Sequence, residues 1–438
     1  MMHAATTTQS VSNTLRDFAA DATTPHDARP LGGHSVPLAT VTRWLAVGVG
    51  FSIPVSTSFS EIMVGLFILC CLFTDRPNWR WMARAGGGAV ALSMGLFGLL
   101  TLGIFWSTAG FADGFRCLLK YREFLYLPMM AKLFTDRRWR QPAMWSYLAG
   151  CAAILALSYL EWCTTFDMGI TREEFPGDHV ISKDRIVHSL LMSLFAYFCA
   201  LEFLRTPGRI RWLFLALIGV AAFNIVFLVQ GRTGYVTLSA LLTLLFANLF
   251  GKRGLIAAGL VLLLGAAVAY GTSQAVRTRF DLTWNQFRNQ FGAERKHSDD
   301  PRLEFYVTTM TLLRDHPWMG TGTGSFEGEY AELIKGKDLR PVSEPHNEYL
   351  LLSVQLGLVG GFAYLTLLGT QWYSGRRMPD WERQVMQGTI LCIGIGSLFN
   401  SLLLSVTGGL VWSYFAGMAC GAWGEADTGV ESQLSHSS

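Results

Sequence analysis

About twelve apolar segments near the length of a bilayer core follow one another along the chain, and they constrain its fold more than any other feature. In lipid, a backbone segment can satisfy its own hydrogen bonds along its whole length only as a helix. Of the 438 residues, 51% are hydrophobic and only 15% charged, which is less charge than soluble domains carry. We therefore predict an all-α polytopic membrane protein. The expected spans are 38–55, 58–74, 88–106, 114–134, 143–162, 186–204, 211–230, 234–250, 254–272, 346–371, 385–404 and 408–424.

The short connections between these spans alternate in charge. The short loops 52–58, 107–113 and 405–409 contain no Lys or Arg. Basic connections are typically cytoplasmic, so both termini are expected there, and the connections after the odd-numbered spans are expected to face outward. The basic connections follow the second, fourth, sixth, eighth and tenth spans and include Arg76, Arg138, Arg209, Lys252 and Arg377.

This topology predicts five parts. A polar, disordered cytoplasmic tail covers 1–37, since it lacks the apolar region of a signal peptide. Nine spans occupy 38–272, an outward loop domain with amphipathic helices covers 273–345, three spans occupy 346–424, and a second cytoplasmic tail covers 425–438.

Eight cysteines lie mostly inside apolar runs and form no pair of CxxC motifs, so neither a zinc site nor a disulfide framework is expected. Asp299 and Asp300 could together hold a divalent cation. Two acids beside Pro301 are more typical of a helix cap or a solvated turn, and we expect no metal. No cofactor and no nucleic-acid partner are expected.

Arg232 lies in the short outward connection before the eighth span, between Gly231 and Gly234. No carboxylate lies within several residues of it, and a guanidinium can bind a phosphate through two hydrogen bonds. The glycines would let the backbone approach a ligand. The alternative is an arginine that reaches to the lipid headgroups. We favour an anion-binding site, because unpaired arginines at membrane depth are rare.

The segment 301–315 is expected to form an amphipathic helix in the outward loop. Its apolar side should pack on the membrane surface or on other loops. The residues at helical spacing are Leu303, Tyr306, Met310 and Leu313. Arg302 opens this helix and is a second candidate ligand for an anion, although Asp299 or Asp300 could pair with it. The loop holds further arginines whose role the sequence leaves open: Arg277, Arg279, Arg288 and Arg295.

Arg116 and Lys120 are spaced i, i+4 in the outward half of the fourth span, so they share a helix face. Together they could bind an anionic ligand. Alternatively, Glu123 could neutralise Lys120, which would make the group structural.

His346 stands where the tenth span begins, and it is followed by Asn347, Glu348 and Tyr349. A His and a Glu are costly to bury at the mouth of a span and are therefore functional candidates. A neutral imidazole can accept a proton near neutral pH, and nearby arginines would disfavour its charged form. The alternative is a His that caps the span or bonds to a loop carbonyl.

The Gly-rich run 320–324 is similar to a phosphate-binding loop only in composition. No strand precedes it and no Gly-Lys-Ser/Thr follows it. We expect a turn, with Pro317 as the helix breaker.

Three stretches together resemble the O-antigen ligase family, within the wider superfamily of O-antigen ligases and polymerases. They are QGRTGY at 230–235, RLEFY and DHPWMGTGTGSF between 302 and 326, and PHNEYLLLSVQLGLVG at 345–360. The resemblance covers roughly 203–361, and the earlier spans match only in hydropathy. It implies a GT-C-like fold and a metal-independent inverting glycosyltransferase of the bacterial inner membrane, whose active site faces the periplasm.

The implied reaction moves an O-antigen polysaccharide from undecaprenyl diphosphate to a sugar hydroxyl of the lipid A core. By this resemblance Arg232 and Arg302 bind the diphosphate and His346 activates the acceptor hydroxyl. An O-antigen polymerase or a protein O-oligosaccharyltransferase is the alternative within the same class. A polysaccharide or lipid transporter is the alternative from another class, but its charged sites should lie at the midplane in paired halves rather than at one face.

Overall fold

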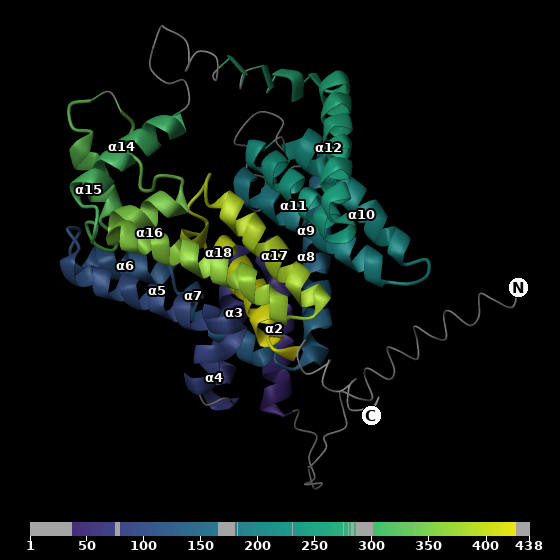
Figure 1. Cartoon of the computed structure of the whole chain (residues 1–438), viewed down its shortest axis with the longest axis horizontal. Coiled ribbons are helices and arrows are strands. Elements are labelled where there is room, and N and C mark those ends of the chain that lie inside the picture. The colour runs from purple at the N-terminus through teal and green to yellow at the C-terminus, as the bar shows by residue number, and fades with distance from the viewer. Residues whose placement is uncertain are drawn as a thin grey trace, which may run out of the picture.

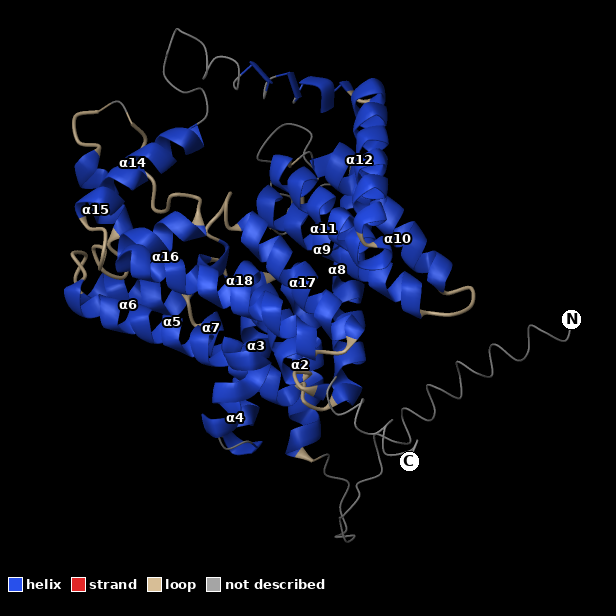
Figure 2. Ribbon diagram, in the orientation of Figure 1, coloured by secondary structure: helices blue, strands red, loops and turns tan. Residues whose placement is uncertain are grey.

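The computed structural model describes residues 37–74, 79–164, 180–181, 183–229, 231–274, 276–278, 280–281, 284–285, 301–337 and 339–425. Within these ranges the secondary structure is helical and contains no strand (Figure 2). The all-α polytopic prediction is confirmed. Apart from Pro37 and Glu425, the two expected tails lie outside the described residues, as does Arg76.

Among the described residues, nine helical segments have the length and apolar composition of membrane spans. The helices in these segments are α2 (Leu38–Val55), α3 (Thr57–Thr74), α5 (Ala89–Gly103), α8 (Arg140–Cys163), α9 (Arg185–Arg205), α10 (Arg211–Phe223), α11 (Arg232–Phe250), α12 (Lys252–Thr272) and α16 (Glu348–Ser374). A short helix, α4 (Trp79–Arg84), precedes α5, and a π-helical segment (Asn224–Val229) extends α10.

The other three expected spans are formed by shorter or interrupted helices. The segment 114–134 is divided into α6 (Phe111–Lys120) and α7 (Glu123–Leu133). The segment 385–404 is α17 (Asp380–Gly396) followed by a 3-10 turn (Leu402–Leu404), and 408–424 is α18 (Val406–Gly421).

Helix α18 lies at the centre of the bundle, and all but one of its residues are buried. It packs closely on α7 because its glycines remove side chains from the contact. A Cβ at Gly417 would lie 2.7 Å from Met130 Cβ, and one at Gly421 would lie 2.7 Å from the Ala131 carbonyl oxygen. On another side Phe415 meets Tyr147 of α8 and Phe198 of α9, with ring centroids 4.8 and 4.7 Å away.

Two helices of the connection between α12 and α16, α14 (Pro301–Asp315) and α15 (Phe326–Leu333), lie beside α16 at the edge of the bundle (Figure 1). The expected helix over 301–315 is confirmed. Its buried side differs by one position from the expected one: Phe305 and Leu312 are buried, whereas Met310 is exposed. The reason is that α14 packs on α15 and α16 through Phe305, whose ring lies 6.4 Å from that of Tyr330.

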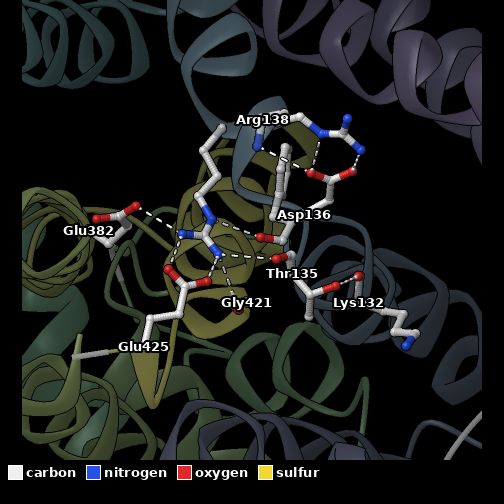
Figure 3. Close-up of polar contacts among 9 residues, drawn as sticks. Lys132, Thr135, Asp136, Arg138, Glu382, Gly421 and Glu425 are labelled. Atoms are coloured by element: carbon white, nitrogen blue, oxygen red, sulfur yellow. Dashed lines mark hydrogen bonds and ion pairs between the residues drawn. The ribbon is translucent and has the colours of Figure 1, made fainter. Parts of the chain in front are cut away.

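Arg140, the first residue of α8, forms hydrogen bonds that connect α7, α8, α17 and α18. Its partners Glu382, Gly421 and Glu425 are labelled in Figure 3. Its side chain is buried, and it donates to Glu382 at the start of α17 and to Glu425 beyond α18, at 3.0 and 2.8 Å. It also donates to the carbonyl oxygen of Phe134 after α7, at 2.8 Å. Although Arg140 follows the basic residues Arg137 and Arg138, it is therefore a buried structural centre.

Candidate functional site

His346 adopts a backbone conformation that non-glycine residues rarely take. Its φ is +52°, and among the described residues it is the one non-glycine with positive φ. Left-handed backbone is uncommon for a residue with a Cβ, and such strain clusters at functional sites. The surrounding contacts hold it: the Tyr306 hydroxyl of α14 donates to the Leu398 carbonyl oxygen at 2.6 Å and lies 3.3 Å from that of His346, and the Phe305 ring lies 6.0 Å from the imidazole.

Glu344 is the charged group beside the imidazole. Its Oε1 lies 3.6 Å from His346 Nδ1, which is an ion-pair distance rather than a hydrogen bond. Both side chains are partly exposed. A carboxylate at this distance from Nδ1 favours positive charge on the ring when the other nitrogen takes a proton, and it leaves Nε2 for a ligand. Sequence analysis predicts arginines near His346 and does not include Glu344, although this carboxylate lies only two residues before the His.

Asn347 and Glu348 fix the start of α16. Asn347 caps the helix by accepting from the Leu350 amide at 3.0 Å, and its amide donates to the Leu398 carbonyl oxygen at 3.2 Å. Glu348 is fully buried, and its backbone amide donates to Ser397. These contacts clamp the residues after His346 onto the end of α17.

The Glu348 carboxylate has a donor at each oxygen. Tyr121, at the break between α6 and α7, donates to Oε1 at 2.9 Å, and the Leu403 amide donates to Oε2 at 3.0 Å. Tyr349 donates to the Gly394 carbonyl oxygen at 2.9 Å. The three residues that follow His346 therefore hold its backbone in place. Their side-chain polar groups bond to the protein itself.

The run 320–324 is a turn, as expected, and its amides are used by the protein itself. Helix α16 is broken at Gly357, where φ is +70°. Thr321 and Gly322 donate to the carbonyl oxygens of Val354 and Gln355 that the break leaves without partners, both at 2.9 Å. The Gln355 side chain accepts in turn from the Gly324 amide at 2.8 Å.

Glycine is required in this turn because backbone meets backbone. A Cβ at Gly322 would lie 2.2 Å from Ser107 Cα, and one at Gly357 would lie 2.1 Å from the Trp318 carbonyl oxygen. The turn thereby joins α5, α14 and α16, and it holds α14 over His346.

Arg232 is the exposed first residue of α11. The glycines around it serve helix packing: a Cβ at Gly231 would lie 2.7 Å from Ser189 Oγ, and one at Gly234 would lie 2.7 Å from Ser189 Cβ. The arginine is thus presented at a helix start that is pressed against α9. This corrects the expectation that the glycines make room for a ligand.

Arg116 and Lys120 lie on the exposed side of α6. Arg116 is paired with Asp113 at 2.8 Å, with both side chains largely exposed. Glu123 is buried against Gly409 of α18, and neither of its oxygens has a hydrogen-bond partner among the described residues. It therefore faces the bundle rather than Lys120.

Several expected residues cannot be placed. Arg302 belongs to α14, but its side chain lies outside the described residues, as do Asp299, Asp300, Arg279, Arg288 and Arg295. Arg277 is described, and it folds back on the end of α12, donating to the Tyr270 carbonyl oxygen at 3.3 Å.

Two buried polar groups near these helix starts were missed by the sequence reasoning. Lys183 donates to the hydroxyls of Thr57 and Thr407, at 3.3 and 3.0 Å, and so joins the starts of α3 and α18. His188 of α9 lies 3.0 Å from Asn224 in the π-helical segment. A Lys beside a span and a His within one were signals of buried polar contacts.

The described residues contain no group of three or more His, Cys, Asp or Glu side chains that could hold a metal ion. The arrangement offers an imidazole beside a carboxylate, on a backbone held by contacts from α14 and from the segment after α17. Such a site can accept a proton from a hydroxyl.

Residues 214–365 match a family model described as O-antigen ligase. The match includes Arg232, α14, the Gly-rich turn and the His346 clamp. No curated protein matches the chain.

Proposed function

We propose that the chain is an O-antigen ligase, because residues 214–365 match the O-antigen ligase family model of membrane glycosyltransferase-like enzymes. Its donor is a polysaccharide on undecaprenyl diphosphate, and its acceptor is a hydroxyl of the lipid A core. The observation that carries this proposal is the family match, because it covers both Arg232 and His346.

His346 is the general base. Its Nε2 takes the proton of the acceptor hydroxyl while the oxygen attacks the anomeric carbon of the donor sugar. The bond between that carbon and the phosphate oxygen breaks, and the lipid diphosphate leaves with the electron pair. A single displacement of this kind inverts the anomeric centre. The Glu344 carboxylate, 3.6 Å from Nδ1, balances the charge that the ring gains.

The leaving diphosphate gains negative charge, which fixed cations stabilise where it develops. Arg232, Arg302 and Lys120 supply these cations. Arg116 contributes less, because Asp113 already pairs with it. A lipid diphosphate is an activated leaving group, so the reaction needs neither a nucleotide nor a metal ion.

The active site faces the periplasm of the inner membrane. Support comes from the Gly-rich turn beside α16: its Thr323 amide donates to the Gly103 carbonyl oxygen at the end of α5, and the loop 107–113 that follows carries no Lys or Arg. A site at this surface receives both the polyprenyl carrier and the acceptor lipid from the bilayer.

The experiment is a reconstitution of the purified protein in liposomes with a lipid-linked polysaccharide and lipid A core, followed by mass spectrometry. A ligase yields glycan on lipid A core and free undecaprenyl diphosphate. Glycan that grows while it remains on the carrier identifies a polymerase and overturns the proposal.

A further inference from the structure

A cavity lies at the far end of α16 from His346, where α16 ends and α5 begins. Its volume is about 460 Å³, within the range of about 300–1,000 Å³ typical of ligand pockets. It is lined by Ala83, Arg84, Gly87, Gly88, Thr370, Tyr373, Ser374, Arg376, Arg377 and Trp423. None of the residues proposed for glycosyl transfer belongs to it.

Three of the lining residues are arginines and none is acidic. Arg84, Arg376 and Arg377 are exposed, and within the described part of the chain none of them forms an ion pair. The acids nearby along the chain are engaged elsewhere: Glu382 and Glu425 with Arg140, and Asp380 with Arg383. The cavity therefore concentrates positive charge that the protein does not neutralise.

Aromatic rings support two of the guanidiniums. Arg376 lies over the Tyr373 ring at 4.6 Å, and Arg377 lies over the Trp423 ring at 5.7 Å. A guanidinium held against a ring loses less conformational freedom when it binds, and its N–H edges stay available for a phosphate. These arginines are consequently better ordered than arginines extended into solvent.

The turn between α4 and α5 keeps the cavity open. Gly86, Gly87 and Gly88 have φ values of +60°, +62° and +95°. A Cβ at Gly87 would lie 3.2 Å from both Ser374 Cβ and Trp423 Nε1, so a side chain there would intrude between the two walls. The left-handed turn folds Arg84 toward the end of α16 without filling the space.

The cavity also lies at headgroup depth. It is placed where the candidate span Arg80–Trp106 begins and the candidate span Glu348–Arg377 ends. Tyr373 is 65% exposed there, as expected for an aromatic residue at a membrane–water boundary. A ligand at this position has its polar part in the cavity and its apolar part along the helices.

We propose that this cavity binds the phosphate headgroup of an anionic phospholipid. Basic pockets between transmembrane helices on the cytoplasmic side bind such headgroups, and the excess of Lys and Arg in the adjoining connections predicts that side here. The acyl chains lie against exposed apolar residues of α16, among them Phe362 and Leu365.

The test is native mass spectrometry of the full chain in neutral detergent, titrated with phosphatidylglycerol or with phosphatidylcholine of the same acyl chains. We expect retained phosphatidylglycerol and little phosphatidylcholine. The triple variant R84Q/R376Q/R377Q should weaken phosphatidylglycerol binding about a hundredfold, because each arginine near an anionic surface contributes roughly a factor of five.

A matched control removes the same charge outside the cavity: R137Q/R209Q/R253Q changes three exposed arginines of other basic connections. Its affinity should stay close to that of the wild type. Thr370→Phe fills the cavity and keeps every charge, and it should also weaken binding. Size-exclusion profiles and melting temperatures close to wild type establish that each variant is folded.

If the two triple variants lose the same amount of phosphatidylglycerol affinity, the effect comes from the overall surface charge and the proposal is overturned. Full binding by Thr370→Phe would overturn it as well. Inorganic phosphate and glycerol phosphate are titrated in the same way as soluble competitors of the lipid. If either binds as tightly as the lipid, the cavity is a site for a soluble phosphate compound rather than for a headgroup.

Discussion

The Tyr121 hydroxyl donates a 2.9 Å hydrogen bond to Oε1 of Glu348, and both side chains are completely buried. The bond joins the break between α6 and α7 to the first residue of α16, two positions after the proposed base. An acid inside a membrane protein is costly unless it is paired or hydrogen-bonded. Here the acid and its donor fix the backbone from which His346 projects.

Tyr121→Phe should destabilise the protein by about 1–3 kcal/mol, since it leaves a buried carboxylate oxygen without its donor. Transfer should slow more than donor binding weakens, because the base is displaced while the cations remain. The matched control is Tyr349→Phe, which removes a hydroxyl that donates to a neutral carbonyl oxygen at the same distance. Its cost should be nearer 1 kcal/mol. Denaturant unfolding in detergent measures both, and equal costs would argue against a special role for Glu348.

His346→Gln should reduce transfer by about a hundred- to ten-thousandfold, because an amide cannot take a proton from the acceptor. Binding of the lipid-linked donor should survive, since cations hold the diphosphate. Single-turnover transfer and donor binding are measured separately, and substantial transfer by His346→Gln would rule out the base.

A pair of variants at the same position separates catalysis from backbone strain. His346→Gly and His346→Ala both remove the imidazole, but only alanine must keep a Cβ at a φ of +52°. The alanine variant should be less stable than the glycine variant by about 1–2 kcal/mol, while both are inactive. Equal stability would mean that the backbone relaxes once the ring is absent.

The sequence predicts the helices well and the polar contacts between them poorly. Apolar length placed nearly all the helices, and the Gly-rich run was correctly read as a turn. That the turn fills a break at Gly357 could not be predicted, because the partners lie more than thirty residues apart and meet only in the fold. Arg140 shows the same limit: its basic neighbours suggest an exposed connection, whereas its carboxylate partners are Glu382 at the start of α17 and Glu425 beyond α18.

Among the candidate site residues, the imidazole and the start of α16 were recognisable from chemistry at a span boundary. The packing role of Gly231 and Gly234 could not be recognised from the sequence. A glycine that lets the backbone approach a ligand looks the same in a sequence as one that lets it approach a neighbouring helix. Arg116 was given a ligand role, yet Asp113, three residues earlier, already pairs with it. Spacing along the chain identified the charged residues, but it could not decide whether each pairs with another residue of the protein or with a ligand.

Arg232→Lys should lose most activity although the charge is kept, because an ammonium cannot form the paired hydrogen bonds of a guanidinium. Loss of one donor to the transition state typically costs about a hundredfold or more. Arg253→Lys, at the start of the next helix, is the matched control and should stay active. Chelation by EDTA should leave the wild type active. Inhibition that magnesium or manganese reverses would show that a metal takes part.

Arg140→Met should destabilise the protein by about 3–5 kcal/mol, because it leaves a buried Glu382 without its cation. Adding Glu382→Gln should recover part of the loss, since the second change removes the unpaired charge. Arg138→Met is the control, because this arginine is 58% exposed and pairs with Asp136 at the surface. Its effect should be within about 1 kcal/mol. Additive losses in the double variant would mean that the Arg140–Glu382 pair contributes little.

Gly322→Ala tests whether the docked turn supports the site from a distance. The new Cβ would lie 2.2 Å from Ser107 Cα, which is backbone, and φ at this position is +94°. Overpacking and a strained backbone each cost about 1–3 kcal/mol, so the turn should leave the break in α16 and α14 should lose its place over His346. Gly328→Ala in α15 is the matched control: its Cβ meets nothing within 4 Å, and alanine should stabilise this helix by up to about 1 kcal/mol. Hydrogen exchange at Thr321 and Gly322 reports the docking, and transfer reports the site. Faster exchange with unchanged transfer would show that the turn stabilises the fold without positioning the base.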